Sequence, residues 1–380
     1  MDQNSLGGDF CLIRIHYKEG PYTPQSAYDL FSATYSPWPT LDALRPSLDI
    51  QQINTGQEYH LPGPWGIVTD DLERLHAMTD EQGYIRFRSG IEFPMVVYRG
   101  QPSEHIPCLP KLARLIHAED QLLALCRCIA FEEVIGEHPY VRFCERVRLM
   151  ESPLYVDKEG LAQHYGFPTN LLDVTSNFDV ASFFATSYWD TTSRSYQPVK
   201  FSRVPGVFYR VCPFLLMGSQ EQVEYRDVGW QPLHRPEQQR AAAIKMTKGL
   251  DFGSLKVVQK VRFTHSARIS TRIWKNFSGG KDLFPSDAPA ELADKASRLM
   301  QFTRSQIDLA WMRFDEWHGA VSEKNTRLLI ESSSGIEVIH TPNLSWDDLD
   351  VERDERRLHE NFNEVQTKIR WRMIADHNRE

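Results

Sequence analysis

The sequence predicts an α+β fold, and three observations support this prediction. Several short runs rich in β-branched and aromatic residues, of which Gly206 to Cys212 is the clearest, are typical of strands. A long segment, Asp120 to Met150, instead places apolar residues at near-helical spacing. With 380 residues, 41% of them hydrophobic, the chain is long enough to bury these elements in one large domain or two ordinary ones.

We divide the chain into an N-terminal accessory region (1–90), a core domain (91–300) and a C-terminal extension packed on the core (301–380). The accessory region is rich in Pro and aromatic residues. Its expected elements are two strands and one short helix: strands from Phe10 to His16 and from Tyr84 to Phe87, and a helix from Asp70 to Met78.

The core domain is expected to begin with a strand, Ile91 to Tyr98, that Arg99 and Gly100 close. Gly136 to Pro139 breaks the Asp120 to Met150 helix, and Gly166 ends the helix after it. The expected helices of this domain are Pro110 to His117, Asp120 to Met150, Asp157 to Tyr165 and Phe178 to Trp189. The later strands are expected from Gly206 to Cys212 and from Leu255 to Phe263.

The C-terminal extension is expected to contain a β-hairpin and a long helix. Arg327 to Glu331 and Ile336 to His340 are the two strands of the hairpin, joined by Ser-Ser-Ser-Gly. An amphipathic helix of about thirty residues is expected from Ser345, where Ser-Trp-Asp-Asp resembles a capping box. One stripe of this helix carries Val351, Leu358, Phe362, Val365, Ile369 and Met373. Packing on its own domain is the preferred explanation of the stripe, and oligomerisation is the alternative.

The overall charge argues against a general nucleic-acid coat, because the net charge is −8 and the pI is about 5.9. One segment has the opposite character. From Arg235 to Lys281 there are eleven Lys and Arg residues and two acids, Glu237 and Asp251. This segment is either a solvated basic face or the lining of a site for an anion, such as a pyrophosphate or a nucleic-acid backbone.

The cysteines and the hydropathy pattern predict a soluble cytoplasmic protein. The six cysteines are scattered without C-x-x-C spacing, so we expect reduced and mostly buried thiols. The first nine residues lack the basic and apolar regions of a signal peptide. No apolar stretch approaches the ~18–20 residues that a membrane span needs.

Several familiar chemistries have no motif in this chain. H-E-x-x-H, G-x-S-x-G, the Walker A sequence and G-x-G-x-x-G are all absent. The thirteen histidines lack ligand spacing, so the sequence does not support a metal site. A nuclease also has little support, because no cluster of carboxylates for metal ions is visible.

The most informative segment, residues 161–177, crowds polar side chains between apolar anchors. Its hydrogen-bonding residues are Gln163, His164, Tyr165, Thr169, Asp173, Thr175, Ser176 and Asn177. Helix capping accounts for one or two of them, because a helix is expected to start near Phe178. His164 alone is explained as a partner of a helix C-terminus. Capping does not account for five such residues, so the segment is interpreted as the lining of a pocket.

A second candidate is Arg99, at the end of the strand that leads into Tyr98-Arg99-Gly100-Gln101. A guanidinium is always charged and grips phosphate or carboxylate with two parallel hydrogen bonds. Gly100 beside it would let a ligand approach the backbone. The alternative is a structural arginine in a salt bridge with a neighbour.

These residues resemble a known family. Tyr98-Arg99-Gly100-Gln101, followed by Leu109-Pro110-Lys-Leu112-Ala-Arg114, resembles the start of the FRG domain, which is named for its Phe/Tyr-Arg-Gly signature. Ala162 to Thr175 is similar to the central block of that family, and Asp179 to Ala185 to its helix of small and aromatic residues. Leu283 to Asp287 resembles its closing element. The four blocks span about residues 96–300.

The resemblance implies a fold similar to the ADP-ribosyltransferase superfamily. Such a fold is a split, curved β-sheet that clasps NAD, here with surrounding helices and a long C-terminal helix. The resemblance implies that Arg99 contacts the ribose or phosphates of NAD. The other NAD-binding residues it implies are Tyr98, Gly100, Gln101, His164, Tyr165, Thr169, Asp173, Ser176 and Asn177.

Transferases of this superfamily use a late Glu or Gln to hold the ribose, and FRG domains usually show an Arg-x-x-Ala-Gln-x-Gly-x-Phe run there. Aligned at Arg240, this chain lacks the Gln of the run. Glu237, with Glu224 as the alternative, is the nearest substitute. Arg99, Thr175 and Glu237 are therefore the expected catalytic residues.

The resemblance implies an NAD-dependent ADP-ribosyltransferase that modifies a macromolecule, either nucleic acid or protein, with NAD as substrate and no metal. FRG-like domains are frequent in bacterial and phage conflict systems, so a toxin or antiphage effector is implied. The alternative is a non-catalytic module that senses a nucleotide or a partner through the same pocket. The fold-level likeness alone does not decide between the two.

Overall fold

The computed structural model describes most of the core and parts of both ends of the chain. The described residues are 38–48, 58–61, 66–80, 82–91, 96–149, 151–217, 223–285, 287–320, 324–346 and 362–371. The expected strand from Phe10 to His16 and residues 347–361 of the expected C-terminal helix lie outside these ranges.

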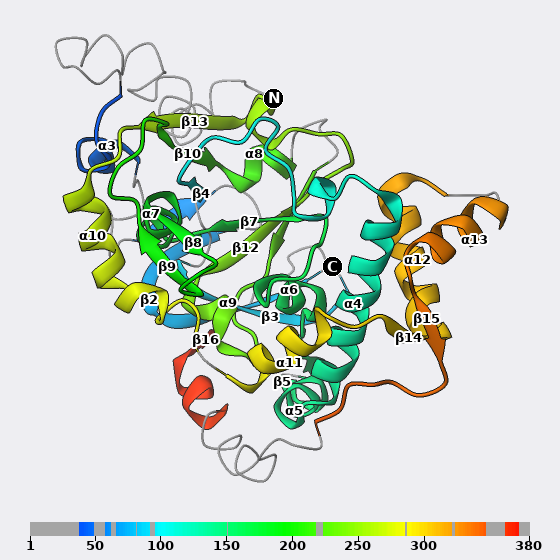
Figure 1. Cartoon of the computed structure of the whole chain (residues 1–380). Helices are drawn as coiled ribbons and strands as arrows, with labels where there is room; N and C mark the ends of the chain where they lie inside the picture. The colour runs from blue at the N-terminus through cyan, green and yellow to red at the C-terminus, as the bar shows by residue number, and fades with distance from the viewer. Residues whose placement is uncertain are drawn as a thin grey trace, which may run out of the picture.

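The centre of the protein is a six-stranded antiparallel sheet (Figure 1). In spatial order its strands are β11 (Glu224–Asp227), β12 (Ala241–Lys245), β7 (Leu171–Thr175), β4 (Val97–Gln101), β10 (Gly206–Val211) and β13 (Val258–Phe263). Both predicted later strands are present, as β10 and β13. Arg99 lies inside β4 rather than after it, because β4 continues to Gln101 and pairs with β10 along its whole length.

This sheet is divided between β4 and β7. β7 pairs with β12 at five positions, and β4 pairs with β10 at five. A single residue pair, Tyr98 with Thr175, joins β4 to β7. The sheet therefore consists of two halves that meet at one residue pair. Beside that pair, the edges of β4 and β7 are not joined by further backbone pairing, so side chains occupy the space between them.

Helices cover both halves. In chain order they are α3 (Leu41–Leu48), α4 (Ala118–Glu137), α5 (Pro139–Arg146), α6 (Lys158–His164), α7 (Phe178–Thr186), α8 (Pro213–Met217), α9 (His234–Gln238), α10 (Ala267–Asn276), α11 (Ala288–Ala296), α12 (Arg304–His318) and α13 (Lys324–Ser333). Short 3₁₀ helices lie at Leu112–Arg114 (η3), Phe252–Ser254 (η4) and Ser278–Gly280 (η5). The mixture of helices and an antiparallel sheet confirms the predicted α+β class.

Helix α7 packs against β4 and β10. The Phe178 ring contacts Tyr98 edge-on at 5.4 Å and stacks on Phe208 at 5.1 Å. A Cβ on Gly100 would lie 2.0 Å from the carbonyl oxygen of Ala181, so only glycine lets the strand and the helix approach this closely. The close approach at Gly100 is therefore made by α7, not by a ligand.

The opposite face of the sheet has its own core. Val97, Val174, Val207 and Phe252 belong to one buried cluster, which η4 and α8 help to cover. Alternate residues of β4 thus enter different cores, as the two-residue period of a strand requires. Burial of each large apolar side chain contributes roughly 1.5–3 kcal/mol.

The predicted helices of the core domain are largely confirmed. The predicted break near Pro139 separates α4 from α5, and the Asp157 side chain caps α6 by accepting from Gly160 N at 2.8 Å. Gly166 ends α6 with φ of +100°. Two helices are shorter than predicted: η3 is all that forms between residues 110 and 117, and α7 gives way to strand β8 after Thr186.

A second sheet corrects one N-terminal prediction. Its strands are β1 (Glu58–Leu61), β2 (Gly66–Thr79), β3 (Ile85–Ile91) and β16 (Ile369–Trp371). Strand β3 confirms the predicted strand near Tyr84, but Asp70 to Met78 lies in β2 and is not a helix. The good helix formers in this run are overruled by pairing with β3 and by burial of Leu75 and Ala77.

The C-terminal extension differs from its prediction in two places. Residues 324–333 form α13, and β15 (Glu337–Ile339) pairs in parallel with β14 (Gln301–Thr303), so there is no hairpin. The reason is that α13 docks on α12 through polar contacts: Trp311 Nε1 donates to Glu331 at 2.7 Å, and Arg327 pairs with Asp315. The expected C-terminal helix ends at residue 368, because Ile369–Trp371 joins β2 as β16.

Four smaller features complete the description. Helices α12 and α13 lie on the outer side of α4, away from the six-stranded sheet (Figure 1). Two short hairpins are formed by β5 (Arg148–Leu149) with β6 (Ser152–Pro153) and by β8 (Ser187–Asp190) with β9 (Ser195–Pro198). The five cysteines in the described ranges are free and buried. No helix within those ranges is long and apolar enough to cross a membrane.

Candidate functional site

A pocket of about 230 Å³ lies where the sheet divides. Its walls come from β4, from the segment around η3, from α6 and the loop after it, and from β7. Aromatic residues of α7, β9 and the segment before α11 close it. The volume is somewhat below the ~300–1,000 Å³ typical of small-molecule sites, so a dinucleotide would extend beyond it.

Arg99 bridges the two halves of the sheet. It stands on β4, and its Nη1 donates to the backbone carbonyl of Asp173 on β7 at 2.7 Å. Its Nε is buried and has no partner among the described residues. Arg99 forms no ion pair within those residues either, so the alternative of a structural salt bridge finds no support there.

Two further cations, Lys111 and Arg114, line the pocket from the η3 segment. Lys111 Nζ donates to the carbonyl of Gly166, and Arg114 donates to the carbonyl of Leu109 from Nε at 3.1 Å and Nη2 at 2.9 Å. Each of the three cations is thus oriented by a backbone carbonyl, and none of them forms an ion pair within the described ranges.

Burial is the main cause of the pKa shifts of Lys111 and Arg114, and neighbouring charges modify them. Burial lowers the pKa of Lys111; attraction by Asp173 opposes the shift, and repulsion by Arg114 adds to it. Burial also lowers the pKa of Arg114, and Arg99 contributes by repulsion. Arg114 thus repels both Lys111 and Arg99, and an anion bound between these cations would relieve that repulsion.

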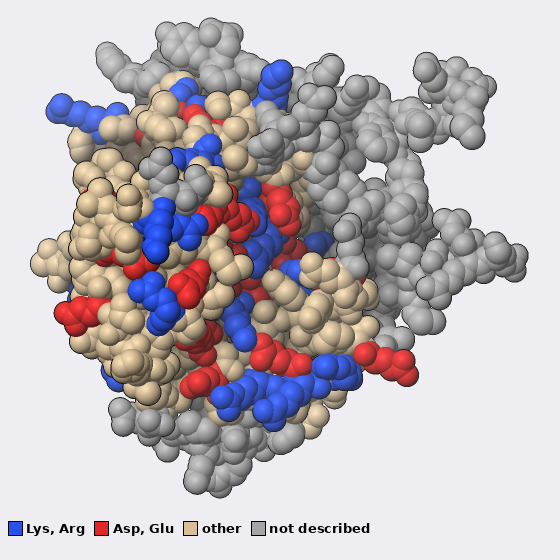
Figure 2. All heavy atoms as spheres, turned by 90° about the vertical axis from the view of Figure 1, so that its right-hand side faces the viewer, with Lys and Arg blue, Asp and Glu red and all other residues tan. Residues whose placement is uncertain are grey.

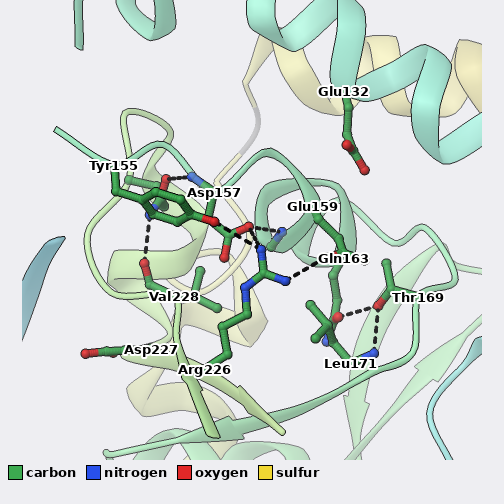
Figure 3. A network of polar contacts seen from close by, with 12 residues as sticks. Glu132, Tyr155, Asp157, Glu159, Gln163, Thr169, Leu171, Arg226, Asp227 and Val228 are labelled. Carbon is green, nitrogen blue, oxygen red and sulfur yellow. Dashed lines mark hydrogen bonds and ion pairs between the residues drawn. The ribbon is translucent and has the colours of Figure 1, made fainter. Parts of the chain in front are cut away.

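The carboxylate of Asp173 faces the cations and is fixed by a chain of hydrogen bonds. Gln163 Nε2 donates to Asp173, Thr169 Oγ1 donates to Gln163 Oε1 at 2.5 Å, and Leu171 N donates to Thr169 Oγ1 at 3.2 Å. Figure 3 shows the hydrogen bonds that join Gln163, Thr169 and Leu171. Among the described residues that line the pocket, Asp173 is the only carboxylate.

Helix α6, which carries Gln163, is anchored at its first turn by an ion-pair network. Arg226 of β11 reaches between Asp157 and Glu159 and pairs with both, at 2.6 Å to Glu159 (Figure 3). The Asp157 side chain is 0% exposed. Burial alone would raise the pKa of Glu159, but Arg313 and Arg226 lower it. The network holds the pKa of Glu159 below its usual value and fixes α6 relative to the sheet.

His164, the last residue of α6, is buried beside the pocket. Its Nδ1 lies 2.9 Å from Gln239 Oε1, and Gln239 Nε2 donates to the carbonyl of Leu283 at 2.9 Å. The backbone carbonyl of Gln239 accepts from Thr175 Oγ1 at 2.7 Å. His164 Nε2 is buried and has no partner among the described residues.

An aromatic wall stands at the other side of the pocket. Phe184, Tyr196 and Phe284 line it, and the rings of Tyr196 and Phe284 stack at 4.9 Å with 18° between their planes. The site thus combines flat apolar rings with three cations. Among the described residues, no group of three or more His, Cys, Asp or Glu side chains is arranged to hold a metal ion.

Residues 94–194 match the FRG domain family. The chain contains an FRG domain. A search of curated proteins gave no match, and neither did a search of solved structures. The FRG domain supplies Arg99, Lys111, Arg114, Asp173 and most of the pocket, whereas Tyr196, Gln239 and Phe284 follow it in the chain.

Four of the predicted site residues, Arg99, His164, Thr169 and Asp173, line the pocket of the FRG domain. The others do not. These are Tyr98, Gly100, Gln101, Tyr165, Thr175, Ser176, Asn177 and Glu237.

Most of the remaining residues support the fold. Asn177 caps α7 by accepting from Asp179 N and Val180 N, so the capping explanation holds for it. Thr175 Oγ1 is occupied by Gln239 and by Asn177 N. Tyr165 donates to Asp287 at 2.5 Å and lies beneath Arg235, whose guanidinium carbon is 4.3 Å from the ring centroid.

Glu237 and Glu224 both lie away from the pocket. Glu237 stands on α9, where burial raises its pKa against the attraction of Arg240 and His234. Glu224 is exposed on the edge strand β11. Neither lines the pocket that Arg99 and Asp173 border.

The basic segment from Arg235 to Lys281 does not line the pocket, apart from the neutral Gln239. Its charges are distributed over several elements, and among the described residues four of its eleven cations form ion pairs with acidic residues elsewhere in the chain. Lys245 pairs with Glu316, Lys260 and Arg262 with Glu104, and Arg272 with Asp42. On the face shown in Figure 2, Lys and Arg are interspersed with Asp and Glu.

Sequence reasoning missed Lys111, Arg114 and Gln239. Lys111 and Arg114 stand in the Leu-Pro-x-Leu-x-Arg run, which served only as a family marker. Gln239 has a clearer signal. When the Arg-x-x-Ala-Gln run of the FRG family is aligned at Arg235 instead of Arg240, its Gln falls on Gln239.

Proposed function

We propose that this protein is an NAD-dependent ADP-ribosyltransferase that modifies a macromolecular acceptor. The observation that carries the proposal is the position of Arg99. It spans the division of the sheet and borders a pocket with two further cations, Lys111 and Arg114. The split of the sheet between β4 and β7 agrees with the ADP-ribosyltransferase-like fold that the FRG resemblance implies.

The lining of the pocket suits the two chemical parts of NAD. Guanidinium and ammonium groups bind the diphosphate, and Arg99, Lys111 and Arg114 supply both kinds of group. The rings of Phe184, Tyr196 and Phe284 offer a flat surface for a nicotinamide or adenine ring. A pocket of about 230 Å³ holds one half of the dinucleotide, with the other half outside it.

The reaction places positive charge on the ribose as the bond from C1′ to nicotinamide breaks. A fixed carboxylate near that carbon stabilises the developing positive charge. Asp173 is the carboxylate available in the pocket, and Gln163 holds it in place. We therefore assign this role to Asp173 and not to Glu237.

A non-catalytic nucleotide-sensing module is the second candidate. It is favoured by one observation: no glutamate lines the pocket within the described residues. In this case the same cations and rings bind a nucleotide, and the signal passes to a partner without cleavage of NAD.

A labelling assay distinguishes the two candidate functions. NAD labelled on its adenylate part is incubated with the protein, mixed nucleic acids and a cell lysate. Arg99→Ala and Asp173→Ala are the test variants. Arg203→Ala is the matched control, because Arg203 is exposed and does not line the pocket. Circular dichroism verifies that each variant folds.

Label on a macromolecule with the wild type and Arg203→Ala, but with neither test variant, supports the transferase and identifies its acceptor class. Release of nicotinamide without transfer of label supports NAD cleavage with water as the acceptor. Intact NAD that binds the wild type but not Arg99→Ala overturns the transferase and supports the sensing module.

The toxin or defence role that the resemblance implies is a further part of the proposal. If it holds, expression of the wild type slows bacterial growth, and Arg99→Ala at equal protein level does not. Equal growth with both proteins contradicts a toxin whose effect depends on this pocket.

A further inference from the structure

The orientation of the Gln239 side chain determines which nitrogen of His164 carries the proton. An amide has one oxygen and one nitrogen, and Gln239 contacts two fixed groups, the carbonyl of Leu283 and the ring of His164. A carbonyl oxygen accepts only, so the amide nitrogen must face Leu283. The amide oxygen then faces His164, and an oxygen there requires a donor on Nδ1.

Neutral His164 therefore carries its proton on Nδ1, which leaves a lone pair on Nε2. This nitrogen is buried and has no partner among the described residues, although the ring belongs to the pocket wall. Buried polar atoms nearly always have a hydrogen-bond partner. Nε2 is thus an unused acceptor on a ring that lines the pocket.

We propose that His164 is the proton acceptor for the attacking hydroxyl in the pocket, with Gln239 as the residue that positions it. This inference rests on the proposed transferase function. The acceptor hydroxyl gives its proton to Nε2 while its oxygen bonds to C1′ of the nicotinamide ribose. The bond from C1′ to nicotinamide breaks, and its electron pair leaves with neutral nicotinamide. The imidazolium then returns the proton to solvent.

Gln239 itself is held on two sides, which makes it a stable partner for the ring. Its side chain donates to Leu283, and its backbone carbonyl accepts from Thr175 Oγ1. A base whose second nitrogen is oriented by another group is the arrangement used by histidines that activate nucleophiles. Thr175, expected from sequence to be catalytic, supports this arrangement through Gln239.

His164→Asn is the main test variant. The Asn amide nitrogen takes the place of Nδ1 and still donates to Gln239, whereas no atom replaces Nε2. His265→Gln is the matched control. His265 also has one bonded nitrogen, Nε2 at 2.8 Å from the carbonyl of Pro102, and one buried nitrogen without a partner in the described ranges, but it does not line the pocket.

Two measurements are made on the full-length chain. The first is transfer of label from adenylate-labelled NAD, with kcat and KM determined separately. The second is the tautomer of His164 in wild-type protein, read from long-range proton–nitrogen correlations in ¹⁵N-histidine-labelled samples and assigned by comparison with His164→Asn. The tautomer can be read whether or not NAD is consumed.

General acid–base groups contribute roughly 10²–10⁴-fold to a rate, so kcat of His164→Asn should fall by about 100-fold or more. KM should change by less than about threefold, because the phosphate-binding groups remain, and His265→Gln should retain wild-type kcat. The tautomer with hydrogen on Nδ1 is expected.

Wild-type turnover together with a kcat of His164→Asn near the wild-type value overturns the proton-acceptor role and leaves the transferase intact. Hydrogen on Nε2 overturns it as well, whatever the turnover. Absence of turnover in the wild type overturns the proposed function, and with it the catalytic role of His164. The tautomer then decides whether Gln239 orients the ring as inferred.

Discussion

The guanidinium of Arg99 and the backbone carbonyl of Asp173 are joined by a hydrogen bond of 2.7 Å across the division of the sheet. The two strands involved share one residue pair, Tyr98 with Thr175. A side chain therefore takes over, at this point, the role that backbone pairing has elsewhere in the sheet. The same guanidinium borders the pocket, so ligand binding and the joining of the two sheet halves depend on one residue.

We expect Arg99→Lys to weaken NAD binding even though it keeps the charge. A single ammonium cannot bond the carbonyl of Asp173 and present a second flat donor edge to a phosphate at the same time. Loss of a charged hydrogen bond costs about 1.5–3 kcal/mol, which corresponds to roughly 10–100-fold in Kd. Isothermal titration calorimetry with NAD measures the change, with Arg203→Lys as the control. Equal Kd values for wild type and Arg99→Lys contradict the bridging role.

Lys111→Gln should weaken anion binding and at the same time stabilise the fold. The pKa of Lys111 is lowered in the folded state, so at neutral pH the folded protein carries a charge that burial and Arg114 disfavour. Glutamine removes this charge and so removes a free-energy cost from the folded state. The unfolded chain carries the charge without that cost, so the variant unfolds less readily. Binding of inorganic pyrophosphate at low and at high salt, and urea unfolding at pH 7, measure the two effects. Tighter pyrophosphate binding by Lys111→Gln contradicts a contribution of Lys111 to anion binding.

The sequence was most informative where local signals and tertiary structure agree. The end of α6 at Gly166, the Asp157 cap and the break at Pro139 are set by residues within one turn of each other. The polar block from 161 to 177 also pointed to the pocket, since Thr169 and Asp173 line it. Such features need no knowledge of distant partners.

Features that depend on partners far along the chain were not predictable in the same way. Residues 70–78 contain good helix formers, but pairing with β3 makes them a strand. Residues 327–331 have strand propensity, but contacts with Trp311 and Asp315 of α12 keep them helical. Gln239 reaches the pocket only because His164, 75 residues earlier, packs beside it.

The buried pair of Arg226 and Asp157 should contribute strongly to stability when only one partner is removed. Arg226→Met leaves Asp157, with 0% side-chain exposure, without its cation and also removes the ion pair to Glu159. Breaking a buried pair in this way costs about 3–5 kcal/mol. Arg298→Met is the control: its pair with Asp294 is exposed and worth only about 0.3–0.5 kcal/mol. Urea unfolding compares the two variants, and equal losses argue against α6 being anchored by this network.

Glu237→Gln tests the conclusion that this glutamate lies outside the pocket. Burial raises the pKa of Glu237 in the folded protein, so the folded state binds its proton more tightly than the unfolded state. Stability therefore falls as pH rises from the unfolded pKa through the folded one. Above that window the ionised carboxylate costs stability, and glutamine removes the cost.

The variant should accordingly be more stable than the wild type at pH 7, and the difference should disappear below the pKa of the unfolded carboxyl group. NAD transfer should remain at the wild-type level, because Glu237 contacts neither Arg99 nor Asp173 and does not line the pocket. Urea unfolding at acidic and neutral pH and the labelled-NAD assay give the two readouts. A large fall in kcat with unchanged stability assigns the catalytic carboxylate to Glu237 and removes that role from Asp173.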